Sequence, residues 1–186
     1  MNKLKEIFAY KSEELSERKL ARSFADVRFM AADAEAPRGF HKALTSSKNP
    51  VALIAEVKKA SPSQGLIRAD FDPVEVATDY EQVGADCLSV LTDEKYFEGS
   101  EQNLRLCKEA VKLPILRKDF TSDPYHIYEA RAMGADAILL IVAGLSPAQL
   151  LEYRELAESL GMDVLVEVHT AEEADIAINS GAKMVG

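Results

Sequence analysis

One arrangement of residues recurs along the chain and constrains its fold more than any other feature. A glycine follows a helical stretch, and a short apolar run follows the glycine: "VGADCLSVLT" (83–92), "MGADAILLIV" (133–142), "LGMDVLVEV" (160–168) and "SGAKMVG" (180–186). Glycine is favoured just after a helix because it adopts positive φ at little cost. Each run is apolar on both faces, as in a strand that is covered on both sides. The arrangement predicts repeated βα units.

Capping residues mark the starts of the expected helices. "DPVE" (72–75), "SPAQ" (146–149) and "TAEE" (170–173) each combine an N-cap residue with an acidic or amide residue three positions later, and two of them carry proline at the first helical position. "DPYH" (123–126) is a weaker version, and Ser100 is expected to cap a helix that follows it. Strands that alternate with capped helices indicate a parallel sheet with right-handed crossovers.

The expected elements fall into two parts. An N-terminal helical extension is predicted over residues 1–50, with a loop at 31–39, and the βα units over residues 51–186. Six strands are expected, at about 51–57, 86–91, 114–118, 136–142, 163–168 and 182–186. Because the chain stops at Gly186 inside an apolar run, we expect it to be truncated at its C-terminus.

Composition narrows the classes of partner. The net charge of −9 argues against a protein that binds the phosphate backbone of nucleic acids, but it leaves room for a small anionic substrate in a local basic pocket. The sequence contains no signal peptide and no apolar run long enough to cross a bilayer. Cys87 and Cys107 form neither a CxxC nor a metal-binding pattern, which fits a reducing compartment. We therefore expect a cytoplasmic protein without a membrane or nucleic-acid partner.

Charged residues stand where the apolar strands end. Glu56 and Lys58 follow "VALIA", Lys118 lies in "LPILRKDF", and Glu167 lies in "DVLVEV". The carboxyl ends of parallel strands share one face, where ligands bind in such folds. Side chains alternate along a strand, so Glu56 and Lys58 are expected to point the same way, as are Lys118 and Phe120. Two carboxylates and two ammonium groups are thus predicted to converge over one pocket.

Simpler explanations exist for each of these residues. A charge at a strand end is the solvated start of a loop about as often as it is a functional residue. A set of four such charges weakens the simpler explanation, because charges kept near a core need partners. Ser61 fits an ordinary turn or a loop that contacts a ligand. Phe97 and Phe120 fit the core or the wall of a pocket. The histidines, His41, His126 and His169, lack metal-ligand spacing and are expected to be surface or packing residues.

Five segments together resemble the indole-3-glycerol phosphate synthase family: "AEVKKASPSQG", "SVLTDEKYFEGS", "LPILRKDF", "GADAILLIV" and "LVEVHT". The resemblance extends over essentially the whole chain. It implies an α/β fold, a (β/α)8 TIM barrel, of which this chain holds about the first six strands behind its helical extension. It also implies a carboxy-lyase of tryptophan biosynthesis that closes the ring of 1-(2-carboxyphenylamino)-1-deoxyribulose 5-phosphate, with loss of carbon dioxide and water and with no cofactor or metal.

The resemblance also implies roles for individual residues. Lys118 matches the general acid that protonates the substrate carbonyl oxygen, and Glu167 matches the carboxylate of the dehydration step. Lys58 matches the residue that holds the carboxylate or phosphate side, and Glu56 the one that orients the lysines. Four further residues match those that contact the substrate in the family: Ser61 and the apolar Phe97, Phe120 and Leu139.

The sequence departs from the family where "KMVG" ends. The family continues there into two more βα units that hold the phosphate, as is usual in such barrels. Two other functions therefore stay open: a related sugar-phosphate barrel such as phosphoribosylanthranilate isomerase, and a fragment that is inactive alone, self-associates through open barrel edges, or needs a C-terminal partner fragment.

Overall fold

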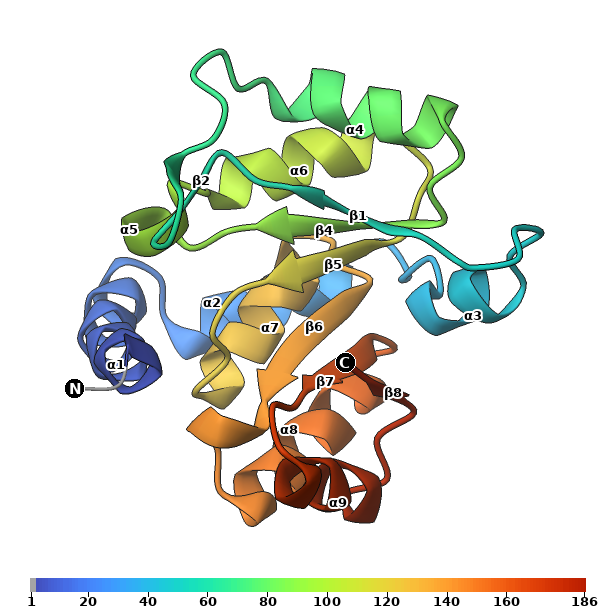
Figure 1. Ribbon diagram of the computed structural model, residues 1–186. Helices are drawn as coiled ribbons and strands as arrows, with labels where there is room; N and C mark the ends of the chain where they lie inside the picture. The colour runs from blue at the N-terminus through green and yellow to red at the C-terminus, as the bar shows by residue number, and fades with distance from the viewer. Residues whose placement is uncertain (1–2) are drawn as a thin grey trace.

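The computed structural model describes residues 3–186; Met1 and Asn2, part of the expected extension, lie outside the described residues. Its centre is a curled sheet of six parallel strands in the order β1-β4-β5-β6-β7-β8 (Figure 1). The strands are β1 (Ile54–Val57), β4 (Cys87–Leu91), β5 (Ile115–Lys118), β6 (Ala137–Ile141), β7 (Asp163–Glu167) and β8 (Met184–Val185). The predicted fold class, a partial α/β barrel of about six strands, is confirmed.

Helices connect these strands and surround the sheet (Figure 1). They are α1 (Lys3–Ala21), α2 (Phe24–Asp33), α3 (Phe40–Thr45), α4 (Pro73–Gln82), α5 (Glu94–Phe97), α6 (Glu101–Ala110), α7 (Pro124–Ala132), α8 (Pro147–Ser159) and α9 (Ala171–Asn179), with a 3-10 turn η1 (Val142–Gly144). A small antiparallel hairpin, β2 (Ala60–Ser61) and β3 (Gly65–Leu66), follows β1. Within residues 3–186, no helix is long and apolar enough to cross a membrane.

The local signals in the sequence act as expected. The side chains of the predicted N-caps accept hydrogen bonds from the first turns of their helices: Asp72, Ser100, Asp123, Ser146 and Thr170. The glycines that follow α4, α7, α8 and α9 all adopt positive φ, between 81° and 89°. These two kinds of signal fix where each βα unit turns.

Two expected boundaries are wrong. The first strand begins at Ile54, three residues later than predicted, because its pairing with β4 starts with Ile54 opposite Cys87. The loop expected at 31–39 begins only after Asp33, because α2 continues through that residue. The division into an extension at 1–50 and a barrel part at 51–186 stays a prediction.

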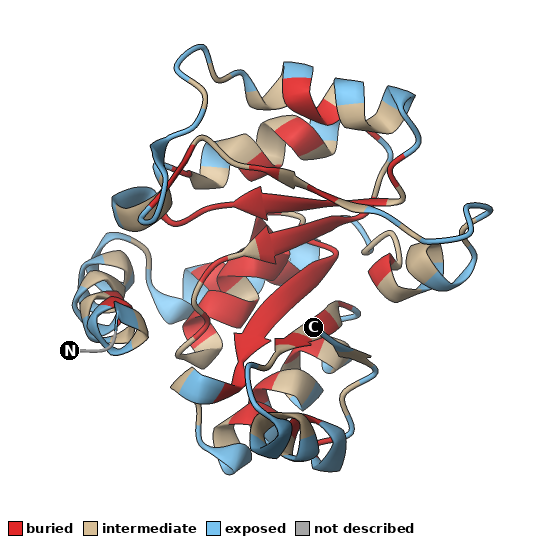
Figure 2. Ribbon diagram, viewed as in Figure 1, coloured by how far each residue is buried: buried red, intermediate tan, exposed pale blue. Residues whose placement is uncertain are grey.

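The core lies between the sheet and its surrounding helices. Figure 2 shows β4, β5 and β6 buried along nearly their whole length. At the amino ends of the strands, Phe40 of α3 is fully buried against Cys87, Leu116 and Ala137. Burial of such an aromatic side chain contributes roughly 1.5–3 kcal/mol, so α3 acts as an apolar cover for this end of the sheet.

Aspartates at the amino ends of the strands hold the extension in place. The Asp136 carboxylate accepts hydrogen bonds from the backbone N–H of Arg38 (2.6 Å) and of Ile115 (2.7 Å). Asp163 accepts one from the backbone N–H of His41 at 2.9 Å. The segment between α2 and α3 and the first turn of α3 are thereby attached to the amino ends of β5, β6 and β7.

Helix α1 lies at the other end of the sheet, near the carboxyl ends of the strands. The Phe8 ring packs edge-on against Phe120, with centroids 5.9 Å apart. It also covers Gly144 so closely that an added Cβ would clash with the ring, and a larger residue there would force the Phe8 side chain to move. The N-terminal extension therefore contacts both ends of the barrel, and α1 is part of the face that carries the charged strand ends.

Candidate active site

A cavity of about 120 Å³ opens at the carboxyl ends of the strands. Its walls come from the ends of β4, β5, β6 and β7 and from α5. The lining residues are Leu91, Phe97, Lys118, Asp119, Phe120, Leu139, Ile141 and Glu167. The structure thus brings together five of the eight predicted site residues around one cavity: Phe97, Lys118, Phe120, Leu139 and Glu167.

Lys118 and Glu167 form an ion pair across this cavity. The Lys118 Nζ lies 2.9 Å from Glu167 Oε2, and both side chains keep 28% of their surface exposed. They come from β5 and β7, with β6 and its Leu139 between them. An ammonium group can donate a proton, and a carboxylate can accept one, to a molecule bound between them. The pair is therefore placed for acid–base chemistry on a substrate in the cavity.

Apart from Asp119, the other residues that line the cavity are apolar. The rings of Phe97 and Phe120 lie 6.2 Å apart between centroids, at an interplanar angle of 37°. Leu139 and Ile141 of β6 are buried beside them. Flat aromatic faces and aliphatic side chains with a few polar groups are typical of sites that bind a planar organic ligand.

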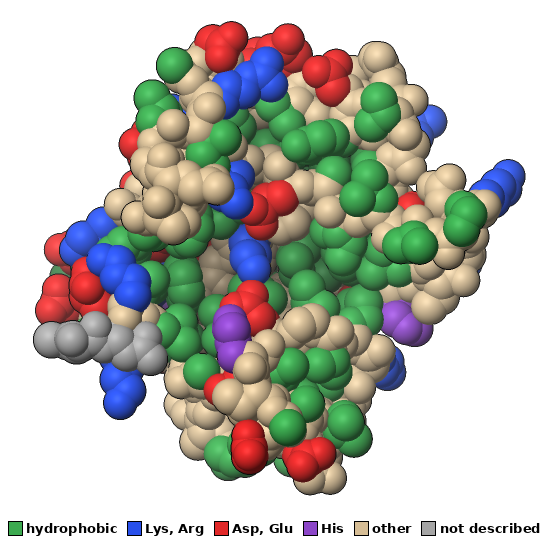
Figure 3. Space-filling model, viewed as in Figure 1, with side chains coloured by type: hydrophobic (Ala, Val, Ile, Leu, Met, Phe, Trp, Pro, Cys, Tyr) green, Lys and Arg blue, Asp and Glu red, His purple; other side chains and the backbone are tan. Residues whose placement is uncertain are grey.

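Glu56 and Lys58 do not line this cavity. They form a separate ion pair at the end of β1, with Lys58 Nζ 2.5 Å from Glu56 Oε1. The structure therefore arranges the four predicted charges as two pairs and not as one cluster. Figure 3 shows acidic and basic side chains following one another along a hollow of this face, between apolar side chains. Both pairs remain on the face that was predicted from the strand ends.

Ser61 is the last residue of β2, directly before the turn to β3. Its hydroxyl accepts a hydrogen bond from the backbone N–H of Gln64 at 3.2 Å and lies 3.4 Å from the Ser63 hydroxyl. Gly65 completes the turn at a φ of +64°, which favours glycine. In this arrangement Ser61 serves the turn, and its contact with a substrate stays a prediction.

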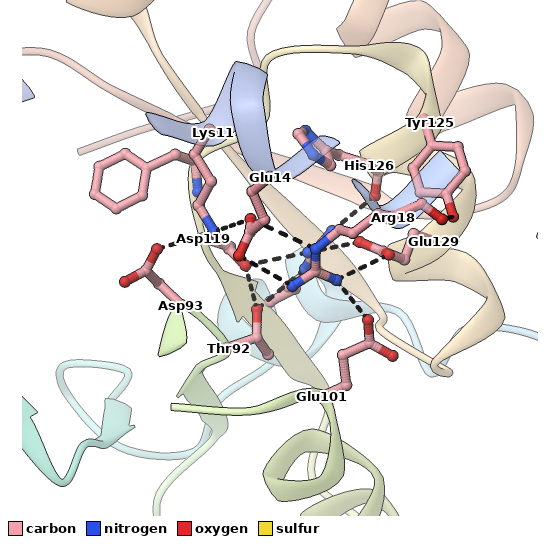
Figure 4. A network of polar contacts seen from close by, with 12 residues as sticks. Lys11, Glu14, Arg18, Thr92, Asp93, Glu101, Asp119, Tyr125, His126 and Glu129 are labelled. Atoms are coloured by element: carbon pink, nitrogen blue, oxygen red, sulfur yellow. Dashed lines mark hydrogen bonds and ion pairs between the residues drawn. The ribbon is translucent and has the colours of Figure 1, made fainter. Parts of the chain in front are cut away.

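The sequence interpretation missed a buried polar network next to the cavity (Figure 4). Its central residue is Lys11 of α1, which is 1% exposed. The Lys11 Nζ lies 2.9 Å from Asp93 Oδ2, from Asp119 Oδ1 and from Glu14 Oε2. Burial by itself lowers the pKa of Lys11, but the charges of Asp119 and Asp93 outweigh it and raise this pKa above the usual value.

Arg117 of β5 extends the network from Asp119 to helix α7. Its Nη2 donates to Asp119 Oδ2 (3.1 Å) and to Glu129 Oε2 (2.9 Å), and its Nη1 donates to the His126 carbonyl oxygen (2.8 Å). Burial by itself raises the pKa of Asp119, but Arg117 and Lys11 outweigh it and hold this pKa well below its usual range. A charge within the apolar run "PILRKDF" was the available signal for this network.

His126 makes the stability of this region depend on pH. Burial and the nearby Arg117 lower the pKa of His126 from 6.5 to about 4, and its Nδ1 accepts a hydrogen bond from the backbone N–H of Ser122 at 3.3 Å. Between these two pH values the unfolded chain binds a proton that the folded chain does not. The free energy of unfolding should therefore fall by about 3 kcal/mol as the pH decreases from 6.5 to 4.

Urea unfolding at several pH values measures this slope. His126→Gln should flatten it between pH 6.5 and 4, whereas His169→Gln, at a side chain that is 63% exposed, should leave it close to that of the parent. An unchanged slope in His126→Gln would contradict the assignment.

Comparisons with known proteins agree on one family. The family model described as indole-3-glycerol phosphate synthase matches residues 4–186. The chain is similar to the indole-3-glycerol phosphate synthase of Bordetella pertussis, with 50% identity over 98% of this chain and 71% of the relative. It is similar also to that of Chlorobium luteolum, with 52% identity over 99% of this chain and 67% of the relative.

One solved structure shares the fold. It is the crystal structure of a putative glycerophosphoryl diester phosphodiesterase from Agrobacterium tumefaciens, with a TM-score of 0.54 and 16% identity. The match covers 78% of this chain and 57% of that chain. At this identity the likeness concerns the fold alone.

Proposed function

Because the chain belongs to the indole-3-glycerol phosphate synthase family, we propose that its cavity is the place where 1-(2-carboxyphenylamino)-1-deoxyribulose 5-phosphate closes its ring. The product is indole-3-glycerol phosphate, and carbon dioxide and water are lost. The Lys118–Glu167 ion pair beside an apolar pocket is the observation that supports this proposal most directly. Proton transfer by positioned side chains of this kind contributes typically ~10²–10⁴-fold to rate.

In the proposed mechanism Lys118 acts first. It donates a proton to the carbonyl oxygen of the sugar chain while the aromatic carbon that carries the carboxylate attacks the carbonyl carbon. The carboxylate leaves as carbon dioxide, and its bonding electrons restore the aromatic ring. Lys118 then regains a proton from solvent. In the dehydration step the new hydroxyl group leaves as water with this proton, and a ring proton is lost to Glu167, which returns it to Lys118 across their ion pair. The aromatic side chains of Phe97 and Phe120 hold the ring of the substrate during both steps.

The second charged pair is proposed to serve the anionic groups of the substrate. Lys58 binds the carboxylate or phosphate side, and Glu56, at 2.5 Å from it, orients this lysine. Ser61 is proposed to contact the substrate from the hairpin that follows β1. These roles require the substrate to extend from the cavity toward the end of β1.

The sheet offers two edges to a partner. Within residues 3–186, no strand pairs with the outer edge of β1 or of β8. Unpaired edges tend to recruit further strands, and a barrel with the tilt and stagger of this family closes with eight. We propose that two further βα units, supplied by a C-terminal fragment, pair with these edges and contribute the phosphate site, and that without them the chain self-associates.

We place this enzyme in the cytoplasm.

Mixing tests both the function and the partner. This chain and a separate fragment carrying the last two βα units of a family member should together form indole-3-glycerol phosphate, whereas each should be inactive or nearly so alone. The physical reason is that positioning of the substrate contributes several kcal/mol to catalysis, about 7–11 in favourable cases. Product formation followed by chromatography measures the result.

Two outcomes would contradict the proposal. Turnover of phosphoribosylanthranilate by the mixture, without ring closure, would favour the isomerase. A monomer of this chain alone that turns over substrate at the rate of an intact family member would show that no partner for the edges is needed.

A further inference from the structure

Lys118 stands between two buried charges. Its neighbours Arg117 and Asp119 are 3% and 4% exposed. Arg117 precedes Lys118 in β5, and because side chains alternate along a strand it is directed away from the side to which Lys118 points. Asp119 directly follows the strand; it borders the cavity, and its carboxylate pairs with Lys11. The position of the Lys118 backbone therefore depends on how firmly the side chains of its two neighbours are held.

Asp119 is held by three different elements. Its Oδ2 accepts hydrogen bonds from Thr92, directly after β4 (2.7 Å), and from Arg117 of β5 (3.1 Å), and its Oδ1 pairs with Lys11 of α1 at 2.9 Å (Figure 4). Among these partners only Lys11 comes from outside the barrel strands. Helix α1 thus contributes a charge directly to the end of the strand that carries Lys118.

The same lysine also binds the end of the neighbouring strand. Lys11 Nζ lies 2.9 Å from Asp93 Oδ2, and Asp93 is fully buried. The other carboxylate oxygen of Asp93 caps α5 by accepting the backbone N–H of Tyr96 at 2.7 Å. Because α5 ends at Phe97, Lys11 is connected through Asp93 to the aromatic wall of the cavity as well.

We propose that Lys11 is a positioning residue of the active site: it bridges the ends of β4 and β5 and so holds the Lys118 ammonium group against Glu167. The inference rests on the proposed function for the importance of Lys118. A purely structural role, in which Lys11 only attaches α1 to the barrel, is the alternative. The two differ in what happens to Lys118 in a variant that remains folded.

The chemical reactivity of the lysine amines distinguishes the positioning role of Lys11 from the purely structural one, and measuring it requires no catalytic turnover. Trace acetylation of the folded chain with acetic anhydride, followed by peptide mass spectrometry, gives a rate for each lysine. Lys58 is a suitable internal reference, because it is 29% exposed and paired with Glu56, whereas Lys118 is 28% exposed and paired with Glu167. Lys58 directly follows β1, and no network residue contacts its ammonium group.

In Lys11→Met the labelling rate of Lys118 relative to Lys58 should rise about fivefold or more, because the strand end shifts and the charge-assisted contact with Glu167 is weakened. Lys19→Met is the matched control. Lys19 lies on the same helix and pairs with Asp123 at 3.1 Å, but it does not reach β4 or β5. In this control the relative rate should stay within about twofold of the parent.

Folding is checked separately by circular dichroism. If Lys11→Met fails to fold, Lys11→Met combined with Asp93→Asn is compared with Asp93→Asn alone, since asparagine keeps the cap of α5 and removes one unpaired buried carboxylate. The same relative increase is expected. A folded variant with an unchanged ratio, or an equal increase at Lys118 and Lys58, overturns the proposal. Changed labelling with no ring closure in the mixing experiment would contradict the proposed function and leave the positioning role intact.

Discussion

Replacement of Lys118 by alanine is expected to lower turnover by about 100-fold or more in the chain completed with a C-terminal fragment, because it removes the proposed general acid. The Michaelis constant should change less, since the apolar walls and the anion-binding groups remain. Loss of the ammonium group also leaves Glu167 without the partner that lies 2.9 Å away. Steady-state kinetics with purified substrate measures both parameters.

Lys19→Ala is the matched control for this experiment, because it removes a partly exposed lysine that does not line the cavity and should leave turnover unchanged. Melting curves of both variants show whether a loss of activity comes from unfolding. If Lys118→Ala kept turnover within a few-fold of the parent, the proton would have to come from another group, and Lys58 would be the first candidate to test.

The arrangement of strands and helices was predictable because its signals are local. The glycines after α4, α7, α8 and α9 and the capping residues before these helices act within one turn of the chain, as at Gly84 and Asp72. Strand boundaries were less predictable. Residues 51–53 have the composition of a strand, but the register with β4 leaves them outside the ladder, and register depends on the neighbouring strand.

The candidate site was predictable in part. The topology of parallel strands places every carboxyl end on one face, so Lys118 and Glu167 were expected together although they are 49 residues apart. The grouping of the charges was not predictable from that rule. Glu56 and Lys58 lie two positions apart on one side of a strand and pair locally, which leaves Lys118 to pair with Glu167.

The place of Lys11 in the buried network could not be derived from the sequence. Lys11 lies in a helix that is rich in charged residues and has the appearance of any solvent-exposed lysine. Its burial follows from where α1 crosses the strand ends, and that position is set by contacts such as Phe8 with Gly144. Only the tertiary structure shows that one lysine from the extension meets Asp93 and Asp119 at once.

Arg117→Met is expected to have the largest effect on stability. Arg117 is 3% exposed and donates to Thr92, Asp119, Glu129 and the His126 carbonyl oxygen. Methionine keeps much of the volume but removes the charge, which leaves buried carboxylates with fewer partners. Breaking a buried ion pair by removing one partner typically costs about 3–5 kcal/mol, and denaturant unfolding should show a loss of that size.

Arg68→Met provides the comparison, because the Arg68 side chain is 36% exposed and pairs with Asp70 and Glu75 at the surface. It should cost less than about 1 kcal/mol, since surface ion pairs contribute little. Arg117→Lys should not restore stability, because an ammonium group cannot reproduce the planar, several-fold donation of a guanidinium group. Equal losses in Arg117→Met and Arg68→Met would mean that the network under β5 does not hold the strand end. In that case the position of Lys118 would have to be set by the sheet alone.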